Sequence, residues 1–271
     1  MTALSAWADQ LAAWTIPDEV LSRAEDSPWV LPRQVFVRRA DRQLAHPVGA
    51  THAAATAALA EPGTVLDVGA AAGATSLALP ATTVIAVDTD GELLDAFAAR
   101  AERQGVSAKV LHGRWPDLAP WAGTVDVALC GNVVYNVADL APFALALTNA
   151  ARREVIVETA ARHPLTELNP LWRRFHGITR PEGPTADDCV AALAEVGIHA
   201  EVTRWRREPE PEYAEFADLV DVTRRRLCLP ADAAPEVDRA LRDQGVDPDL
   251  PPDLGSSGRD LVTLTWPGRA T

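Results

Sequence analysis

The sequence predicts an α/β fold in which a mostly parallel β-sheet carries helices on both faces. Between about residues 62 and 206, short runs rich in Val, Ile and Leu alternate with amphipathic stretches, the order expected when helices connect parallel strands. The apolar runs are compact, as is typical of strands covered on both faces. The chain has 271 residues, 48% of them hydrophobic, so we expect one domain with additions.

Seven strands are expected along the chain. The first five are TVLDVG (64–69), TVIAVD (83–88), AKVLHG (108–113), VDVALCG (125–131) and REVIVET (153–159). Two more, IHAEVTRWRRE (198–208) and RDLVTLTWPG (259–268), flank an insertion of about fifty residues. The insertion has two helical patterns, at 213–227 and 235–245, and then a loop rich in Pro, Asp and Gly at 246–258.

Amphipathic helices are expected between the strands, at 90–105, 138–153 and 185–197. Asp90 is suited to cap the start of the first and Gly105 its end. Thr185 and Asp188 have the spacing of a capping box at the start of the third. A further helix is expected directly after the glycine-containing turn that ends the first strand.

The chain is expected to divide near residue 60. Residues 1–60 are predicted to form an N-terminal helical extension or lid, with helices at 5–14 and 49–60 beside or over the sheet. Residues 61–271 then form the main domain, with a helical insertion at about 209–257.

Charge and composition favour a small-molecule ligand. The formal net charge of -13 disfavours a surface for duplex nucleic acid, because phosphate binding depends on many Lys and Arg contacts. The three cysteines are far apart and have no metal-site spacing, so we expect reduced thiols and no metal. The N-terminus lacks a basic region, and no apolar run approaches a membrane span, so we expect a cytoplasmic protein that binds no membrane.

The turn after the first strand is built from small residues. Gly69, Ala71 and Gly73 place bare backbone at the carboxyl end of the sheet, where open α/β folds bind ligands. The dinucleotide fingerprint needs glycine at positions 71 and 74, and both are alanine, so a nicotinamide cofactor is disfavoured. Asp88 ends the second strand, where a carboxylate can accept hydrogen bonds from both hydroxyls of a ribose. The turn with Asp88 indicates a ligand with a ribose, whereas the turn alone would also fit a tight connection without one.

The ordered segments resemble the class I S-adenosylmethionine-dependent methyltransferases, a Rossmann-like family. VLDVGAAAG is similar to the family's glycine-rich first motif, and VIAVD to its ribose-binding strand end. HGRWPDL, VDVALCGNVVYNV and REVIVE follow in the family's order. NVVYNVADLAPF and HPLTELNPLWRRFHGITRPEGPTADD are similar to a bacterial subgroup of unknown substrate. The resemblance implies a sheet whose seventh strand is antiparallel, between the fifth and the sixth.

The resemblance also implies the cofactor and its contacts. The cofactor is S-adenosyl-L-methionine, which leaves as S-adenosyl-L-homocysteine. The implied cofactor-binding residues are Asp67, Gly69, Ala71, Gly73, Asp88, Thr89, Arg114, Trp115 and Asn132. Asp88 would hold the ribose, and Asn132 would face the methionine end or the acceptor. Trp115 fits equally well as a core aromatic residue.

Methyl transfer needs no metal and no obligatory triad, because the cofactor brings the activated group. A base is needed only if the acceptor atom is protonated, and the candidates for a catalytic role are Tyr135, His163 and His176. Each histidine also fits a structural role. Asn132 and Tyr135 keep the outer spacing of the Asn-Pro-Pro-Tyr motif of amino methyltransferases, but valines replace the prolines, so that chemistry is not supported.

Two clusters of arginine suggest an anionic or planar small-molecule acceptor. One is PLWRRFHGITRP, with Arg173, Arg174 and Arg180, and the other is FVRRADR in the N-terminal extension, with Arg38, Arg39 and Arg42. Both also fit a solvated helix face paired to neighbouring Asp and Glu. The expected function is methyl transfer to a small molecule; a tRNA or rRNA methyltransferase and a non-catalytic binding protein for the same cofactor are the alternatives. The oligomeric state stays open.

Overall fold

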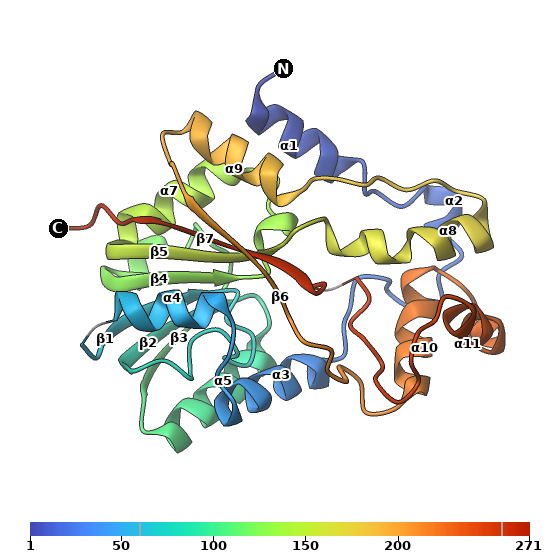
Figure 1. Cartoon of the computed structure of the whole chain (residues 1–271), viewed down its shortest axis with the longest axis horizontal. Helices are drawn as coiled ribbons and strands as arrows, with labels where there is room; N and C mark the ends of the chain where they lie inside the picture. The colour runs from blue at the N-terminus through green and yellow to red at the C-terminus, as the bar shows by residue number, and fades with distance from the viewer. Residues whose placement is uncertain (60, 256) are drawn as a thin grey trace.

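The computed structural model describes residues 1–59, 61–255 and 257–271. One seven-stranded sheet runs through the molecule in the order β3-β2-β1-β4-β5-β7-β6 (Figure 1). The strands are β1 (Gly63–Val68), β2 (Ala81–Asp88), β3 (Ser107–His112), β4 (Val125–Gly131), β5 (Ala151–Ala160), β6 (Glu201–Arg206) and β7 (Asp260–Pro267). The predicted helix 49–60 and the predicted loop 246–258 each include one residue outside the described ranges.

The direction of the strands confirms the predicted α/β class. β1 to β5 pair in parallel, and β7 pairs antiparallel with both β5 and β6. The central strands β1, β4 and β5 are buried along most of their length, whereas the edge strands β3 and β6 are largely exposed. The expectation that the first five strands are covered on both faces is therefore wrong for β3, whose side chains are largely exposed at the edge of the sheet.

Helices cover both faces of the sheet, and one apolar core layer is buried on each face. α4 (Ala50–Ala58) and α5 (Gly91–Gln104) pack on one face, in a cluster that includes Leu59, Phe97 and Leu129. α1 (Ala3–Ala12), α7 (Leu140–Ala150) and α9 (Ala186–Glu195) pack on the other. The remaining helices are α2 (Asp18–Leu21), α3 (Arg33–Ala45), α6 (Ala119–Ala122), α8 (Asn169–His176), α10 (Phe216–Arg226) and α11 (Ala234–Asp243), with short 3-10 turns at Val134–Asn136, Pro164–Leu168 and Ala231–Ala233.

The expected caps are present. Asp90 Oδ1 accepts hydrogen bonds from the backbone N–H groups of Glu92 and Leu93, and Gly105 ends α5 in the left-handed region with a φ of 69°. Thr185 and Asp188 form the predicted capping box at the start of α9. These local signals mark the starts of α5, which connects β2 to β3, and of α9, which leads to β6.

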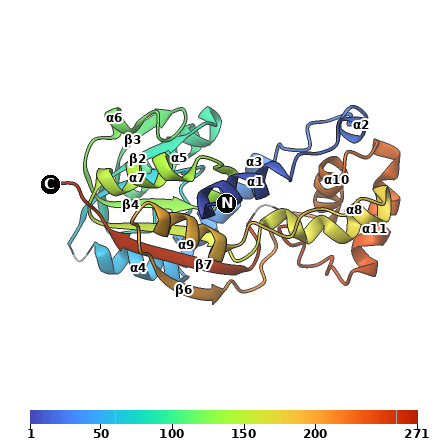
Figure 2. The same ribbon diagram turned by 90° about the horizontal axis from the view of Figure 1, so that it is seen from above.

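A further apolar cluster lies beside the sheet. α2, α8, α10 and α11 form a helical lobe beside the sheet, which Figure 2 shows from above. Its core includes Leu171, Trp172, Leu219, Val237 and Leu241. The N-terminal segment and the insertion before β7 therefore pack together with the segment that follows β5, a long-range association that the division near residue 60 did not predict.

One predicted helix is absent. Residues 71–80 form a series of turns, in which the Leu77 N–H donates to the Gly73 carbonyl, and no helix follows β1. Proline at position 80 and the short span before β2 leave little room for regular structure. Conversely, α3 and α8 form where only arginine clusters were noted. In the described part of the chain, none of the helices combines the length and the apolar character needed to cross a membrane.

Candidate active site

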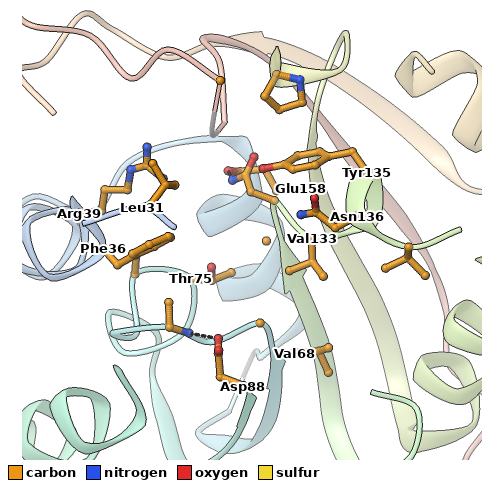
Figure 3. Close-up of a pocket in the computed structure, with 18 of the residues that line it drawn as sticks. Leu31, Phe36, Arg39, Val68, Thr75, Asp88, Val133, Tyr135, Asn136 and Glu158 are labelled. Atoms are coloured by element: carbon orange, nitrogen blue, oxygen red, sulfur yellow. Dashed lines mark hydrogen bonds between the residues drawn. The ribbon is translucent and has the colours of Figure 1, made fainter. Parts of the chain in front are cut away.

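A cavity of about 1550 Å³ opens at the carboxyl ends of the central strands. Its walls come from the segments that follow β1, β2, β3, β4 and β5, from the N-terminal segment and from the end of α10. Figure 3 shows the turn after β1 with Asp88 at one end of the cavity, and Tyr135 with Glu158 at the other. The sheet therefore places the predicted ligand turn and a separate group of polar side chains in one open cavity.

The turn after β1 approaches its neighbours too closely for larger residues. Gly69 has a φ of 74°, and a Cβ built there would lie 2.2 Å from Val133 Cγ2. Gly73 has a φ of 97°, and its Cβ would lie 2.3 Å from Leu77 Cδ1. Both positions thus require glycine for backbone conformation and for space. Ala71 also has a positive φ, of 44°, so the loss of a glycine there is tolerated.

Asp88 fixes this turn. Its Oδ2 accepts a hydrogen bond of 2.8 Å from the Ala71 N–H, drawn as a dashed line in Figure 3, and its Oδ1 accepts one of 2.9 Å from the Asp90 N–H. Each carboxylate oxygen can accept a second bond. Asp88 therefore orders the turn and still presents acceptors to the cavity that it lines.

Asp67 lies beneath the turn, and it is not among the cavity-lining residues. Its side chain is fully buried, and its Oδ2 accepts a hydrogen bond of 2.5 Å from Ser76 Oγ. Oδ1 is buried and has no hydrogen-bond partner among the described residues. Burial raises the pKa of Asp67 to about 7, partly offset by the Ser76 hydrogen bond. The structure thus places Asp67 where it can support the turn, without direct access to a ligand.

The raised pKa predicts a pH-dependent gain in stability for Asp67→Asn. The folded protein keeps this proton to a higher pH than the unfolded chain, so the wild type loses stability as pH rises from the ordinary aspartate range to about 7. Relative to the wild type, the free energy of unfolding of Asp67→Asn should rise by about 2–4 kcal/mol between pH 5 and pH 8. Urea unfolding of both proteins at pH 5 and pH 8 measures this change. If the difference in free energy of unfolding between Asp67→Asn and the wild type is the same at both pH values, the raised pKa of Asp67 is contradicted.

The residues expected near an adenine ring are divided between surface and core. Thr89 and Arg114 are exposed and line the cavity. Trp115 is 6% exposed, and its Nε1 donates a hydrogen bond of 3.1 Å to the Phe143 carbonyl. It belongs to the main core and also lines the cavity, so the two alternatives for Trp115 are compatible. His112 Nε2 lies 3.0 Å from the Thr89 carbonyl, which ties the ends of β2 and β3 together.

Asn132 and Glu158 form a polar pair where β4 and β5 end. Asn132 Nδ2 donates a hydrogen bond of 2.6 Å to Glu158 Oε1, and the Asn132 N–H donates to the Glu158 carbonyl. Arg207 donates a second bond, of 3.0 Å, to the same carboxylate oxygen. Asn132 Oδ1 is buried and has no partner among the described residues. The pair therefore holds the Glu158 carboxylate in the cavity wall in a fixed orientation.

Tyr135 and His163 lie together in the cavity wall. Burial raises the pKa of Tyr135 well above its usual range and lowers the pKa of His163 to about 4. The His163 ring stacks on Trp14 with centroids 4.3 Å apart, and its Nδ1 accepts a hydrogen bond of 3.3 Å from the Leu165 N–H. A second backbone bond, to Tyr135, engages the ring as well. These contacts favour a positioning role for His163 over proton transfer.

His176 is not brought to the site. It ends α8, packs against Trp172, and its Nε2 lies 2.7 Å from the Leu227 carbonyl. It is not among the residues that line the cavity, so the structure does not bring it together with the other candidates. The spacing from β5 suggested proximity, but α8 runs away from the sheet into the helical lobe (Figure 2).

The two arginine clusters have different outcomes. Arg173 and Arg174 are exposed on α8, and Arg180 donates to the Trp14 and Thr15 carbonyls, so this cluster lies outside the cavity lining. Arg39 and Arg42 on α3 do line it. Both pair with Glu212, at 2.9 Å and 2.7 Å, and Arg39 also pairs with Asp253.

Several lining residues were not found from the sequence. They include Trp14, Trp29, Phe36, Thr75 and Arg226. Four of these five come from the N-terminal segment or the insertion, which reach the site through the packing of the helical lobe and, for Phe36, through the packing of α3. The aromatic residues near the N-terminus were the one available signal, and they fit core packing equally well.

Comparison with known proteins identifies the central part of the chain. Residues 65–154, about a third of the chain, match the family model described as a methyltransferase domain. The matched segment includes most of β1, β2 to β4, the turn after β1 and Asp88, so the match agrees with the resemblance to class I S-adenosylmethionine-dependent methyltransferases that the sequence shows. The search of curated proteins gave no match.

Solved structures with a similar chain arrangement include three bacterial proteins. Magnesium protoporphyrin IX methyltransferase (ChlM) from Synechocystis PCC 6803, with bound S-adenosylhomocysteine, is 18% identical with a TM-score of 0.46, over 64% of this chain and 78% of that one. YcgJ from Bacillus subtilis is 17% identical with a TM-score of 0.48, over 78% and 93%. YjhP from E. coli is 17% identical with a TM-score of 0.47, over 88% and 100%. At this level of similarity their substrates say nothing about the substrate of this protein.

Proposed function

We propose that the protein transfers a methyl group from S-adenosylmethionine to a small-molecule acceptor by in-line displacement. The observation that carries the proposal is the single cavity of about 1550 Å³, which is lined both by the turn with Asp88 and by aromatic and charged side chains beyond it. Small-molecule sites commonly measure roughly 300–1,000 Å³. The cavity therefore has room for the cofactor and a second molecule together.

The end of the cavity at the turn after β1 offers the contacts that S-adenosylmethionine requires. We propose that Asp88 accepts hydrogen bonds from the ribose hydroxyls, while the turn from Gly69 to Ala71 gives close backbone contact. Asn132 Oδ1, which has no hydrogen-bond partner among the described residues, is an acceptor suited to an ammonium group. When bound, S-adenosylmethionine supplies a methyl group already activated on a sulfonium sulfur.

The protein's own contribution is then positioning and exclusion of water. Aligned reactants can lower the barrier by roughly 7–11 kcal/mol, whereas a positioned base contributes about 10²–10⁴-fold. We propose that the side chains of the N-terminal segment close over the acceptor, as expected of a lid. Glu158 Oε2 makes neither of the bonds that fix Oε1, and it is the group we propose to receive a proton if the acceptor carries one. Tyr135, whose hydroxyl points toward Glu158 in Figure 3, would help to orient the acceptor.

Transfer of labelled methyl groups tests this proposal. Purified protein is incubated with methyl-tritiated S-adenosylmethionine and a bacterial extract separated into metabolites, RNA and protein. We expect label in the metabolite fraction, with loss of that label in Glu158→Gln and retention in the exposed control Arg242→Gln. Label in RNA would replace the proposal by the nucleic-acid alternative, and no label with intact binding of S-adenosylhomocysteine would favour a binding protein without turnover.

A further inference from the structure

Arg226 is a buried cation in the cavity wall, at the end of α10. It is the last residue of α10, is 8% exposed, and lines the cavity together with Tyr135, His163 and Leu165. The C-terminal end of a helix favours a positive charge, which is one reason that arginine is tolerated there. Its role in the fold, however, is not explained by its contacts.

The guanidinium of Arg226 lacks a partner among the described residues. No hydrogen bond or ion pair to those residues reaches it, and its Nε is buried with no acceptor. The two preceding arginines are different, because Arg224 and Arg225 both pair with Asp221, at 2.9 Å and 3.0 Å. The buried arginine that faces the cavity is thus left unpaired, while its neighbours on the same helix are paired.

A buried charge without a partner lowers the stability of the folded protein. Burial disfavours the charged guanidinium and therefore lowers the pKa of Arg226. The charge of Asp253 acts in the opposite direction, but that carboxylate already pairs with Arg39. Guanidinium remains charged at any physiological pH. A residue that costs stability and faces a cavity is typical of a binding site.

The side chains around Arg226 indicate the chemistry of a ligand that would bind there. Trp14, Trp29 and Leu165 line the cavity and also a small void next to it that Arg226 borders. These are large apolar side chains, two of them flat. A ligand anchored at the guanidinium would therefore place an apolar or aromatic body against them.

We propose that Arg226 binds a carboxylate of the methyl acceptor, whose apolar part packs against Trp14, Trp29 and Leu165. This inference rests on the proposed function. A carboxylate fits a planar guanidinium through two parallel hydrogen bonds. The negative charge of Asp253, which acts on Arg226, suits a ligand with one negative charge better than a phosphate with two.

Calorimetry with chemical probes tests the proposal. The probes are naphthoate and phenylacetate, their carboxamides, and phenyl phosphate, each titrated into protein saturated with S-adenosylhomocysteine. We expect the carboxylates to bind at least tenfold more tightly than the carboxamides, which keep the shape but lose the charge. Arg226→Gln should weaken carboxylate binding at least tenfold and leave carboxamide binding unchanged. The matched control is Arg225→Gln, which removes an arginine from the next position, outside the cavity lining.

Thermal unfolding separates a binding role from a structural one. Because Arg226 has no partner to lose, we expect the melting temperature of Arg226→Gln to equal or exceed that of the wild type, with S-adenosylhomocysteine binding retained. A lowered melting temperature together with lost cofactor binding would assign Arg226 a structural role and overturn the inference. Equal binding of carboxylates and carboxamides, no binding of either, or preference for phenyl phosphate would also overturn it. If S-adenosylhomocysteine itself does not bind, the proposed function fails first.

Discussion

Replacing Gly69 with alanine is expected to abolish binding of S-adenosylhomocysteine and to lower the free energy of unfolding by about 2–4 kcal/mol. The new Cβ would lie 2.2 Å from Val133 Cγ2, and valine has little freedom to rotate away. The φ of 74° adds the cost of a left-handed backbone for an L-residue. Relief of the contact must move the turn or Val133, and both line the cavity.

Gly105→Ala is the matched control for this prediction. Gly105 has nearly the same φ, of 69°, but a Cβ there would meet nothing within 4 Å. It should lose only about 1–2 kcal/mol, the cost of the backbone conformation, and should bind S-adenosylhomocysteine normally. Urea unfolding and calorimetry on both variants give the comparison. If both variants bind equally well, close approach at Gly69 is not what shapes the ligand site.

Asp88→Ala is expected to reduce the affinity for S-adenosylhomocysteine by about a hundredfold or more. The change removes acceptors for two ribose hydroxyls, and charge-assisted hydrogen bonds contribute about 1.5–3 kcal/mol each. It also leaves the Ala71 and Asp90 N–H groups without their acceptor, which loosens the turn. Asp88→Asn, which keeps one acceptor oxygen, should bind with intermediate affinity.

The control for the Asp88 variants is Asp95→Asn, an exposed carboxylate on α5 with the same change in net charge. Calorimetric titration of the three variants and the wild type measures the effect. Equal losses in Asp88→Asn and Asp95→Asn would show that net charge, and not hydrogen bonding at the ribose, sets the affinity.

The sheet could be predicted because its signals are local. Each strand from β1 to β5 is a compact apolar run, and the caps at Asp90 and Thr185 mark helix starts by side-chain chemistry alone. The cofactor turn and Asp88 could be found for the same reason, since both follow directly from strand ends. The absent helix after β1 was mispredicted because alanine-rich sequence favours a helix, while the few residues before β2 allow only turns.

The acceptor side of the cavity could not be predicted because it is assembled from distant segments. Trp14, Phe36 and Arg226 are far apart in sequence and come together through the apolar packing of the helical lobe and α3. His176 lies away from the cavity for the corresponding reason. Its helix, α8, belongs to the helical lobe, and its ring contacts the Leu227 carbonyl. Sequence patterns indicate which face of a helix or strand is buried, but not which element packs against that face. In this protein, the acceptor side of the cavity depends on which elements pack together.

The most direct test of the account is calorimetric titration of the purified protein with S-adenosylhomocysteine, with NAD as the control ligand. The turn from Gly69 to Gly73 and Asp88 predict micromolar binding of S-adenosylhomocysteine and none of NAD. Binding of NAD alone, or of neither ligand by a protein shown to be folded, would contradict the assignment of this cavity to S-adenosylmethionine.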